Sequence, residues 1–180
     1  ETTESQGLTS FNNNGFTIGT STDLNQNSRE YVSYTFKKQE KFFDVVTYTG
    51  TGAGLNVSHS LGQVPGMMWI GSRDKTEKFA IWHKDAVNAS VGITRRSFAS
   101  VGSGSGWSND NDAWNDTDPT SSVFTVGNKG DTGEDGNTYV AYLFGHNAEG
   151  DGTDIIHCGS YNGTSGENAS GVSETVGFEP

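Results

Sequence analysis

Acidic side chains gather in two polar stretches of the sequence, and hard oxygen ligands of this kind are what calcium prefers. Three of them, Asp131, Glu134 and Asp135, lie between Gly130 and Gly136. Neither stretch completes an EF-hand loop, because no bidentate Glu follows at the required position. The alternative is that these residues are turn formers in solvated loops. The candidate metal ligands are therefore Asp131, Glu134 and Asp135, and no cofactor other than calcium is expected.

Histidine, serine and aspartate are present in a combination that nucleophilic catalysis uses. Asp44, His59 and Ser60 can be drawn as a triad. However, the four histidines are scattered, and the Gly/Ser run at residues 102–106 lacks the preceding strand and following helix of a nucleophile elbow. We therefore assign no catalytic residues and predict that the protein is not an enzyme.

Two tryptophans lie in the polar segment at about residues 97–118, which is predicted to be a long exposed loop. An exposed indole ring stacks on the apolar face of a sugar, while neighbouring amide and carboxylate groups bind its hydroxyls. The alternative is that Trp114 folds back and anchors the loop to the core. The candidate ligand-binding residues are Trp107, Trp114, Asn109 and Asp110, with a host surface glycan as the ligand.

The elements that would position these residues are predicted to be strands. Short runs of β-branched and aromatic residues alternate with Gly, Asn, Asp and Ser clusters, and helical periodicity is nearly absent. The predicted strands are residues 16–19, 31–36, 42–49, 55–60, 67–72, 78–82, 92–98, 123–126, 138–144, 154–161 and 172–178. This spacing predicts an all-β protein, an antiparallel β-sandwich built from internally repeated units with little or no helix.

An internal repeat is visible in the sequence. Residues 16–36 (FTIGTSTDLNQNSREYVSYTF) align without a gap on residues 124–144 (FTVGNKGDTGEDGNTYVAYLF), at an offset of 108. The identical pairs are Phe16/Phe124, Thr17/Thr125, Gly19/Gly127, Asp23/Asp131, Tyr31/Tyr139, Val32/Val140, Tyr34/Tyr142 and Phe36/Phe144. Duplication predicts equivalent positions in two β-units, with at least one tyrosine or phenylalanine of each C-terminal pair buried and Tyr34 in a core. A long period of this kind is typical of tandem arrays.

The repeat continues with small slips, since residues 44–50 (DVVTYTG) align on residues 154–160 (DIIHCGS). The predicted organisation is a polar arm at 1–7, a first β-repeat unit at 8–115 and a truncated second unit at 116–180, which can also pack with the first as one domain. The second copy stops at Pro180, before the strand that follows Pro65 in the first. We therefore expect an excerpt of a longer polypeptide, an open sheet edge and a homo-oligomer that covers it.

Charge and composition exclude several classes of partner. The formal net charge of −11 makes a phosphate backbone an unfavourable ligand, so nucleic-acid binding is excluded. Cys158 is the single cysteine, so the chain has no internal disulfide. No apolar run approaches the roughly 20 residues that a membrane span needs, so membrane insertion is not expected.

Several of these motifs together resemble a known family. Residues 41–52 (KFFDVVTYTGTG) and 57–68 (VSHSLGQVPGMM) are similar to a repeat family in virion structural and tail-fibre-like proteins of marine tailed phages. Residues 114–127 (WNDTDPTSSVFTVG) and 139–144 (YVAYLF) resemble the second half of the same repeat, and the match spans about residues 8–180.

The resemblance implies a β-rich architecture and a location in the virion. It implies a structural or adhesive role as a tail fibre or capsid decoration module, with other copies of itself and virion proteins as partners. It supplies no catalytic residues. The alternative function is a carbohydrate-binding module that recognises a host surface glycan through the tryptophan loop.

Overall fold

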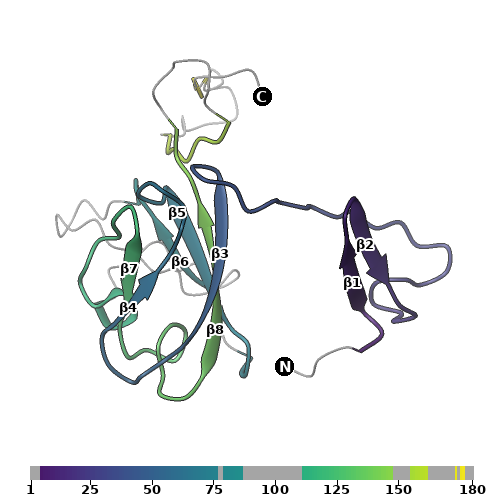
Figure 1. Ribbon diagram of the computed structural model, residues 1–180, viewed down its shortest axis with the longest axis horizontal. Coiled ribbons are helices and arrows are strands. Elements are labelled where there is room, and N and C mark those ends of the chain that lie inside the picture. Colours follow the sequence, from purple (N-terminus) through teal and green to yellow (C-terminus); the bar gives the residue numbers. More distant parts are fainter. Residues whose placement is uncertain are drawn as a thin grey trace, which may run out of the picture. The chain divides into compact units, whose positions relative to one another are not determined.

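The chain forms two compact units, residues 1–36 (unit 1) and 37–180 (unit 2), in a computed structural model (Figure 1). The structure describes residues 5–76, 79–86, 111–147, 155–161, 173 and 175–176. The division falls after Phe36 and not near residue 115, where the sequence predicted it. The reason is that strands from both predicted halves pair with one another in unit 2, so these halves pack as one domain.

Unit 1 contains one antiparallel hairpin, formed by β1 (Leu8–Asn12) and β2 (Gly15–Ile18). Asn13 and Asn14 form the tight turn between the strands, and Gly15 at the start of β2 pairs with Asn12. Before the hairpin, the predicted polar arm is partly built into the unit, because the carbonyls of Gln6 and Gly7 accept hydrogen bonds from residues that follow β2.

The larger sheet of unit 2 has the strand order β3-β8-β5-β6, and all neighbours are antiparallel. Its strands are β3 (Phe43–Thr49), β8 (Thr138–Phe144), β5 (Met67–Ser72) and β6 (Ala80–His83). β8 is central, and alternate residues along it are buried, as expected for a strand with one face on the core. Strand β8 therefore depends on β3 at one edge and on β5 at the other.

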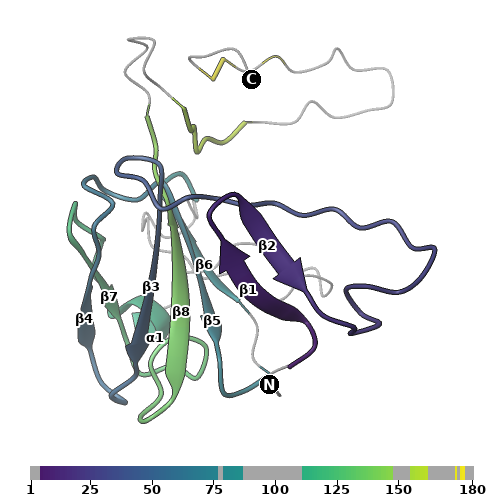
Figure 2. The same cartoon turned by 45° about the vertical axis from the view of Figure 1, so that its right-hand side comes forward.

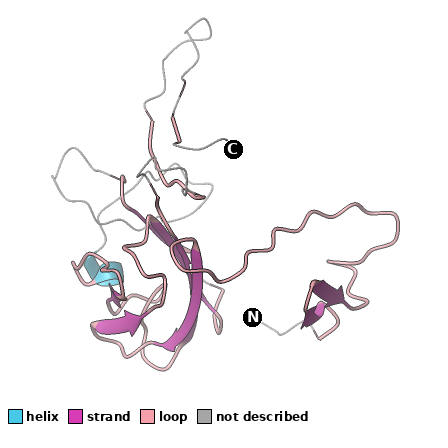
Figure 3. Cartoon of the chain, turned by 45° about the horizontal axis from the view of Figure 1, so that its top comes forward, coloured by secondary structure: helices cyan, strands magenta, loops and turns pink. Residues whose placement is uncertain are grey.

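A second, two-stranded sheet pairs β4 (Leu55–Ser58) with β7 (Val123–Val126). The single short helix of the described residues, α1 (Asn111–Trp114), lies next to β7 (Figures 2 and 3). The fold is therefore all-β and antiparallel, which confirms the predicted fold class.

The core of unit 2 lies between its two sheets. Tyr139, Ala141 and Leu143 of β8 are fully buried, and Phe124 and Val126 of β7 belong to the same cluster. Each large apolar side chain buried in this way contributes about 1.5–3 kcal/mol relative to an exposed one. The sandwich-like packing of two small sheets is thus held by alternate residues of a few strands.

Most predicted strands of unit 2 appear within about two residues of the predicted bounds. Two predicted strands do not form in the described residues: residues 31–36 and 155–161 have no strand structure. The prediction at 92–98 and most of that at 172–178 lie outside the described residues, and β1 was not predicted. A strand needs a neighbour for its backbone hydrogen bonds, and residues 31–36 have none in unit 1.

The predicted burial of the repeated aromatic residues is only partly correct. Tyr139 is fully buried, but Tyr142 and Phe144 are half-buried and Phe36 is exposed. Tyr34 is 83% exposed, so its assignment to a core was wrong.

Among the described residues, no helix has the length and apolar character to span a membrane.

Candidate functional site

The structure does not give Asp44, His59 and Ser60 the hydrogen bonds of a catalytic triad. Both hydrogen bonds of the His59 ring go to the backbone: Nε2 donates to Thr120 O at 3.2 Å, and Leu61 N donates to Nδ1 at 3.3 Å. Ser60 Oγ instead donates to Asp44 Oδ2 at 3.2 Å. His59 therefore does not face the hydroxyl that it would have to deprotonate.

Asp44 is a buried structural carboxylate. Its Oδ1 accepts from Val45 N at 2.8 Å and from Lys38 Nζ at 2.7 Å, and its Oδ2 accepts from Ser60 N at 2.7 Å. Burial raises the pKa of the Asp44 carboxyl, but the hydrogen bonds and charge of Lys38 and the bonds from Ser60 and Val45 outweigh it, so the pKa is lowered. Asp44 thus stays ionised and ties the start of β3 to residue 60.

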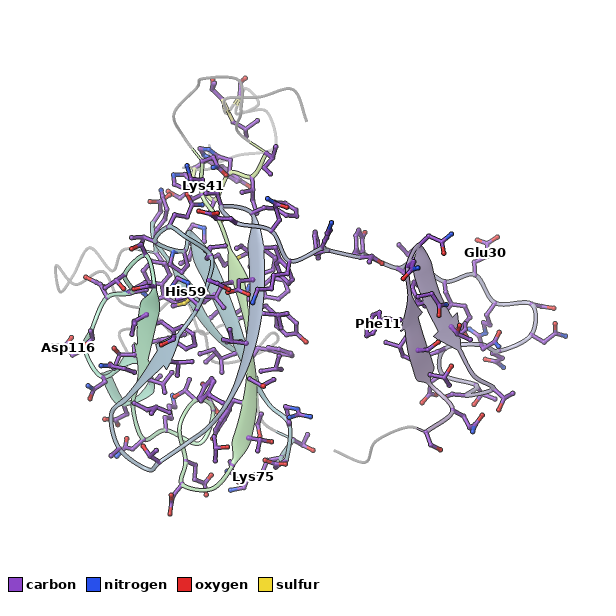
Figure 4. The ribbon with its side chains drawn as sticks, in the orientation of Figure 1. Phe11, Glu30, Lys41, His59, Lys75 and Asp116 are labelled. Atoms are coloured by element: carbon purple, nitrogen blue, oxygen red, sulfur yellow. The ribbon has the colours of Figure 1, made fainter. Side chains whose placement is uncertain are left out.

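His59 is neutral for a related reason. Burial lowers the pKa of His59 more than the hydrogen bond with Thr120 and the negative charge of Asp44 raise it. The ring, whose position inside unit 2 is labelled in Figure 4, stacks on Phe124 with centroids 6.3 Å apart. It joins the end of β4 to the segment before β7.

The predicted metal ligands do not converge on one point. Asp131 lies 3.7 Å from Lys129 Nζ, while Glu134 Oε2 accepts from Lys75 Nζ at 2.6 Å and from Asn137 Nδ2 at 3.0 Å. Asp135 is exposed. Within the described residues, no group of three or more His, Cys, Asp or Glu side chains could hold a metal ion.

Of the four predicted glycan-binding residues, the structure describes only Trp114. Trp107, Asn109 and Asp110 lie outside the described residues. Trp114 ends α1, is 1% exposed and belongs to the core cluster of unit 2. Its position corresponds to the anchor alternative and not to a sugar platform.

Cys158 is equally unsuited to act as a nucleophile. Burial raises the pKa of the Cys158 thiol to about 11, so the thiol is protonated at neutral pH. Its Sγ donates to Gly145 O at 3.3 Å, and its backbone N donates to His146 Nδ1 at 3.1 Å.

Unit 1 has an exposed apolar face, and the backbone around this face is held by hydrogen bonds. Its large side chains lie around an open cavity of about 490 Å³ formed by the hairpin and by residues 24–35. Phe11 of β1, labelled in Figure 4, is among the most exposed of them. The exposed apolar side chains that line the cavity are Leu8, Phe11, Phe16, Ile18, Leu24, Tyr31, Val32 and Tyr34. We call this surface the unit 1 apolar face.

The backbone around this face repeats that of the aligned segment in unit 2. Leu24 N and Asn25 N donate to Ser21 O at 3.2 and 2.8 Å, and at the offset of 108 Thr132 N and Gly133 N donate to Lys129 O at 3.0 and 2.7 Å. The bond from Arg29 N to Gln26 O likewise has its counterpart from Asn137 N to Glu134 O, each 3.2 Å long. Both segments contain one turn with a left-handed residue at the aligned position, Ser28 and Gly136.

The hydroxyl groups of the aligned residues Tyr31 and Tyr139 also make equivalent hydrogen bonds. Tyr31 OH accepts from Gln26 N at 3.0 Å and donates to Thr22 O at 3.3 Å. Tyr139 OH accepts from Glu134 N at 3.0 Å and donates to Gly130 O at 2.7 Å. The local structure of the two aligned segments therefore agrees, although their side chains are covered to different extents.

The unit 1 apolar face is defined by this difference in exposure between the aligned side chains. Phe16 is 39% exposed where Phe124 is 1% exposed, and Tyr31 is 48% exposed where Tyr139 is fully buried. In unit 2 the ring of Tyr139 stacks on Tyr48 of β3, with centroids 5.3 Å apart. Unit 1 has the residues of a core but not the strands that cover it.

The sequence contained a signal for part of this face that strand prediction missed. Phe11 and Phe16 pair across the hairpin, and an Asn-Gly dipeptide such as Asn14-Gly15 between apolar residues is a strong hairpin signal, although the turn itself is formed by Asn13 and Asn14. No local sequence pattern shows that the aligned aromatic residues of unit 1 are without covering strands in that unit.

The fold and this surface define an all-β module with an uncovered apolar face. The chain belongs to the family described as Domain of unknown function (DUF7483), whose family model matches residues 1–180. No curated protein and no solved structure matches the chain.

Proposed function

We propose that this chain is a structural or adhesive module of a phage-type virion, in a tail fibre or a capsid decoration, that acts through assembly contacts between copies. The observation that carries the proposal is the unit 1 apolar face, which is exposed and has a defined backbone around it. Large exposed apolar patches on a folded protein mark interaction surfaces.

The energetics favour coverage of this face by protein. Phe11, Phe16, Tyr31 and Tyr34 are aromatic and exposed. Each large apolar side chain that becomes buried contributes about 1.5–3 kcal/mol, so a few of them are enough to drive association. Aromatic residues are also enriched in the cores of protein interfaces.

The virion location is supported by the resemblance of residues 41–52 and 57–68 to phage structural repeats. In the fold these residues contribute β3, the end of β4 and the turn before β5. Asp44 and Ser60 from the two strings bond each other, so the motif has a clear role in holding unit 2 together.

The glycan-binding alternative has less support from the described residues. Of its four candidate residues only Trp114 is described, and it is buried in the core. We therefore base the proposal on assembly and not on sugar recognition.

Sedimentation velocity and particle labelling test the proposal. We expect the chain to associate as its concentration rises, and Phe11→Asp to weaken this association because a charge in the face must be desolvated. Val64→Asp is the matched control, since Val64 is an exposed apolar residue of unit 2. Antibodies against the chain should label purified phage particles. A chain that is monomeric at every concentration and absent from particles would contradict the proposal.

A further inference from the structure

We propose that the unit 1 apolar face accepts, as its neighbouring strand, residues 155–159 of a second copy of the chain. This inference rests on the proposed assembly function and names the two segments that meet. In this arrangement residues 31–36 of one copy form a strand beside the donated segment of the next.

The acceptor is identified by its counterpart in unit 2. Residues 16–36 and 124–144 share sequence and the hydrogen bonds of their connecting loops. In unit 2, the counterpart of residues 31–36 is β8, which pairs with β3 along its whole length. In unit 1 the same residues are exposed and form no strand. β8 also pairs with β5 on its other side, so the described part of unit 1 contains no strand in the place of β3 or of β5. The proposed contact supplies the strand with the character of β3.

The donor is identified by its sequence. Residues 154–160 (DIIHCGS) align on residues 44–50 (DVVTYTG), which contain most of β3. Ile155 and Ile156 take the places of Val45 and Val46, and β-branched residues suit a strand. In this structure residues 155–159 form no strand, and Ile155 is 56% exposed. The chain thus carries a β3-like segment and a β8-like segment that are not in strand structure.

The pairing of β3 with β8 fixes the register of the proposed interface. Val45 lies opposite Tyr142, and Val46 lies opposite Ala141. Transferred through the two alignments, Ile155 of one copy lies opposite Tyr34 of the other. Tyr48 lies opposite Tyr139, which places Cys158 against Tyr31.

Donation exchanges one set of contacts for another. Cys158, which is buried in its own unit, gives up its hydrogen bonds to His146 Nδ1 and Gly145 O. Ile156 O gives up the hydrogen bond from Asn147 N at 2.9 Å, and the His157 ring gives up its contact with His146. In return, the backbone of residues 155–159 and of residues 31–36 gains a strand ladder, and the ring of Tyr31 is covered. Strand addition to an unpaired segment of this kind combines main-chain hydrogen bonds with side-chain burial. Because each copy has one donor and one acceptor, the contact is head-to-tail and builds a ring or an open chain of copies.

Disulfide trapping between two different variants tests the register. One variant carries Tyr34→Cys and the other Ile155→Cys, both in a Cys158→Ser background in which the serine hydroxyl can still donate to Gly145 O. Opposite residues of an antiparallel pair have Cα atoms about 4.5–5.5 Å apart, which a disulfide can bridge. Each protein has a single thiol, so a mixed disulfide reports contact between copies only. The control partner is Val64→Cys, which is 50% exposed and therefore as accessible as residue 155.

We expect the mixture of Tyr34→Cys and Ile155→Cys to form the mixed dimer several-fold faster than the mixture of Tyr34→Cys and Val64→Cys. Equal rates in the two mixtures would overturn the inference. Rapid formation of a Tyr34→Cys homodimer alone would also overturn it, because two apolar faces would then cover each other. In either case, wild-type chains that still associate in sedimentation would leave the proposed assembly function standing with a different contact.

Discussion

Asp44 is the residue on which the start of the larger sheet depends. It is fully buried, and its two oxygens accept hydrogen bonds from Lys38, Val45 and Ser60. Lys38 itself is about half exposed. The structural value of Asp44 therefore comes from satisfying buried backbone N–H groups more than from an ion pair at the surface.

We expect Asp44→Asn to lower the free energy of unfolding by about 1–3 kcal/mol, because the amide cannot accept all of these hydrogen bonds and turns a donor toward one of the N–H groups. Urea denaturation is the measurement. Asp135→Asn, an exposed carboxyl in the same unit, is the control and should change the stability by less than about 0.5 kcal/mol. Equal effects of the two substitutions would show that Asp44 is not a structural centre.

The pH dependence of this difference follows from the lowered pKa of Asp44. In the unfolded chain an aspartate titrates near about 3.9, and in the folded protein Asp44 titrates below its ordinary value. Its contribution to stability is therefore complete above about pH 5 and is lost as the pH falls through the folded pKa. The stability difference between wild type and Asp44→Asn should be constant from pH 7 to 5 and shrink below about pH 4. A difference that grows on acidification would contradict this assignment.

Trp114 shows at the residue scale how packing decides a role. Its polar neighbours in sequence are compatible with an exposed sugar-binding ring and with a buried anchor. In the structure, Trp114 belongs to the same buried cluster as Phe124 and Val126, because α1, which ends at Trp114, packs against β7.

At the scale of elements, one sequence pattern has two outcomes. Tyr139–Phe144 lies within β8 between two strands, whereas the aligned residues 31–36 have no neighbouring strand. A segment becomes a strand only when it pairs with a second strand, since the backbone hydrogen bonds of a sheet join neighbouring strands.

Hydrogen exchange measures this contrast. In dilute solution, the amides of residues 31–36 should exchange rapidly and those of residues 139–144 slowly, because only the latter are in a ladder. At higher protein concentration, the amides of residues 31–36 should become protected from exchange if a strand of a second copy pairs with them. The amide of Gln26 provides an internal reference, since it is already bonded to Tyr31 OH within unit 1. Slow exchange of residues 31–36 at the lowest concentration would show that unit 1 supplies its own neighbour.

At the scale of the whole molecule, aligned residues lie in different compact units and therefore contribute differently to the stability of unit 2. All four tryptophans lie in residues 37–180, so their fluorescence reports on unit 2. Phe124 is in the core of that unit, and Phe16 is on the uncovered face of the other.

We expect Phe124→Ala to lower the stability of unit 2 by about 3–5 kcal/mol through lost contacts and cavity formation. Phe16→Ala, at the aligned position, should leave the same tryptophan-monitored transition within about 0.5 kcal/mol in dilute solution, because it lies in a separate unit. Urea denaturation followed by fluorescence makes the comparison. Similar losses for both variants would mean that the two units unfold together.

The strands of unit 2 were predictable from the sequence for a physical reason. Their apolar residues alternate or form short β-branched runs between Gly, Asn and Asp turns, and both signals are local. The all-β class followed from the same signals, together with the absence of helical periodicity. The repeat of residues 16–36 in residues 124–144 was also visible in the chain itself.

Only the tertiary structure decided which of these segments find partners. It showed that Asp131 and Glu134 lie beside Lys129 and Lys75 and not around a common ion position. It also left the aromatic residues of unit 1 uncovered, although their counterparts in unit 2 are buried. The physical reason is the same in each case: burial and strand pairing join residues far apart in the sequence, and a local pattern specifies which residues can pair but not whether a neighbour is present.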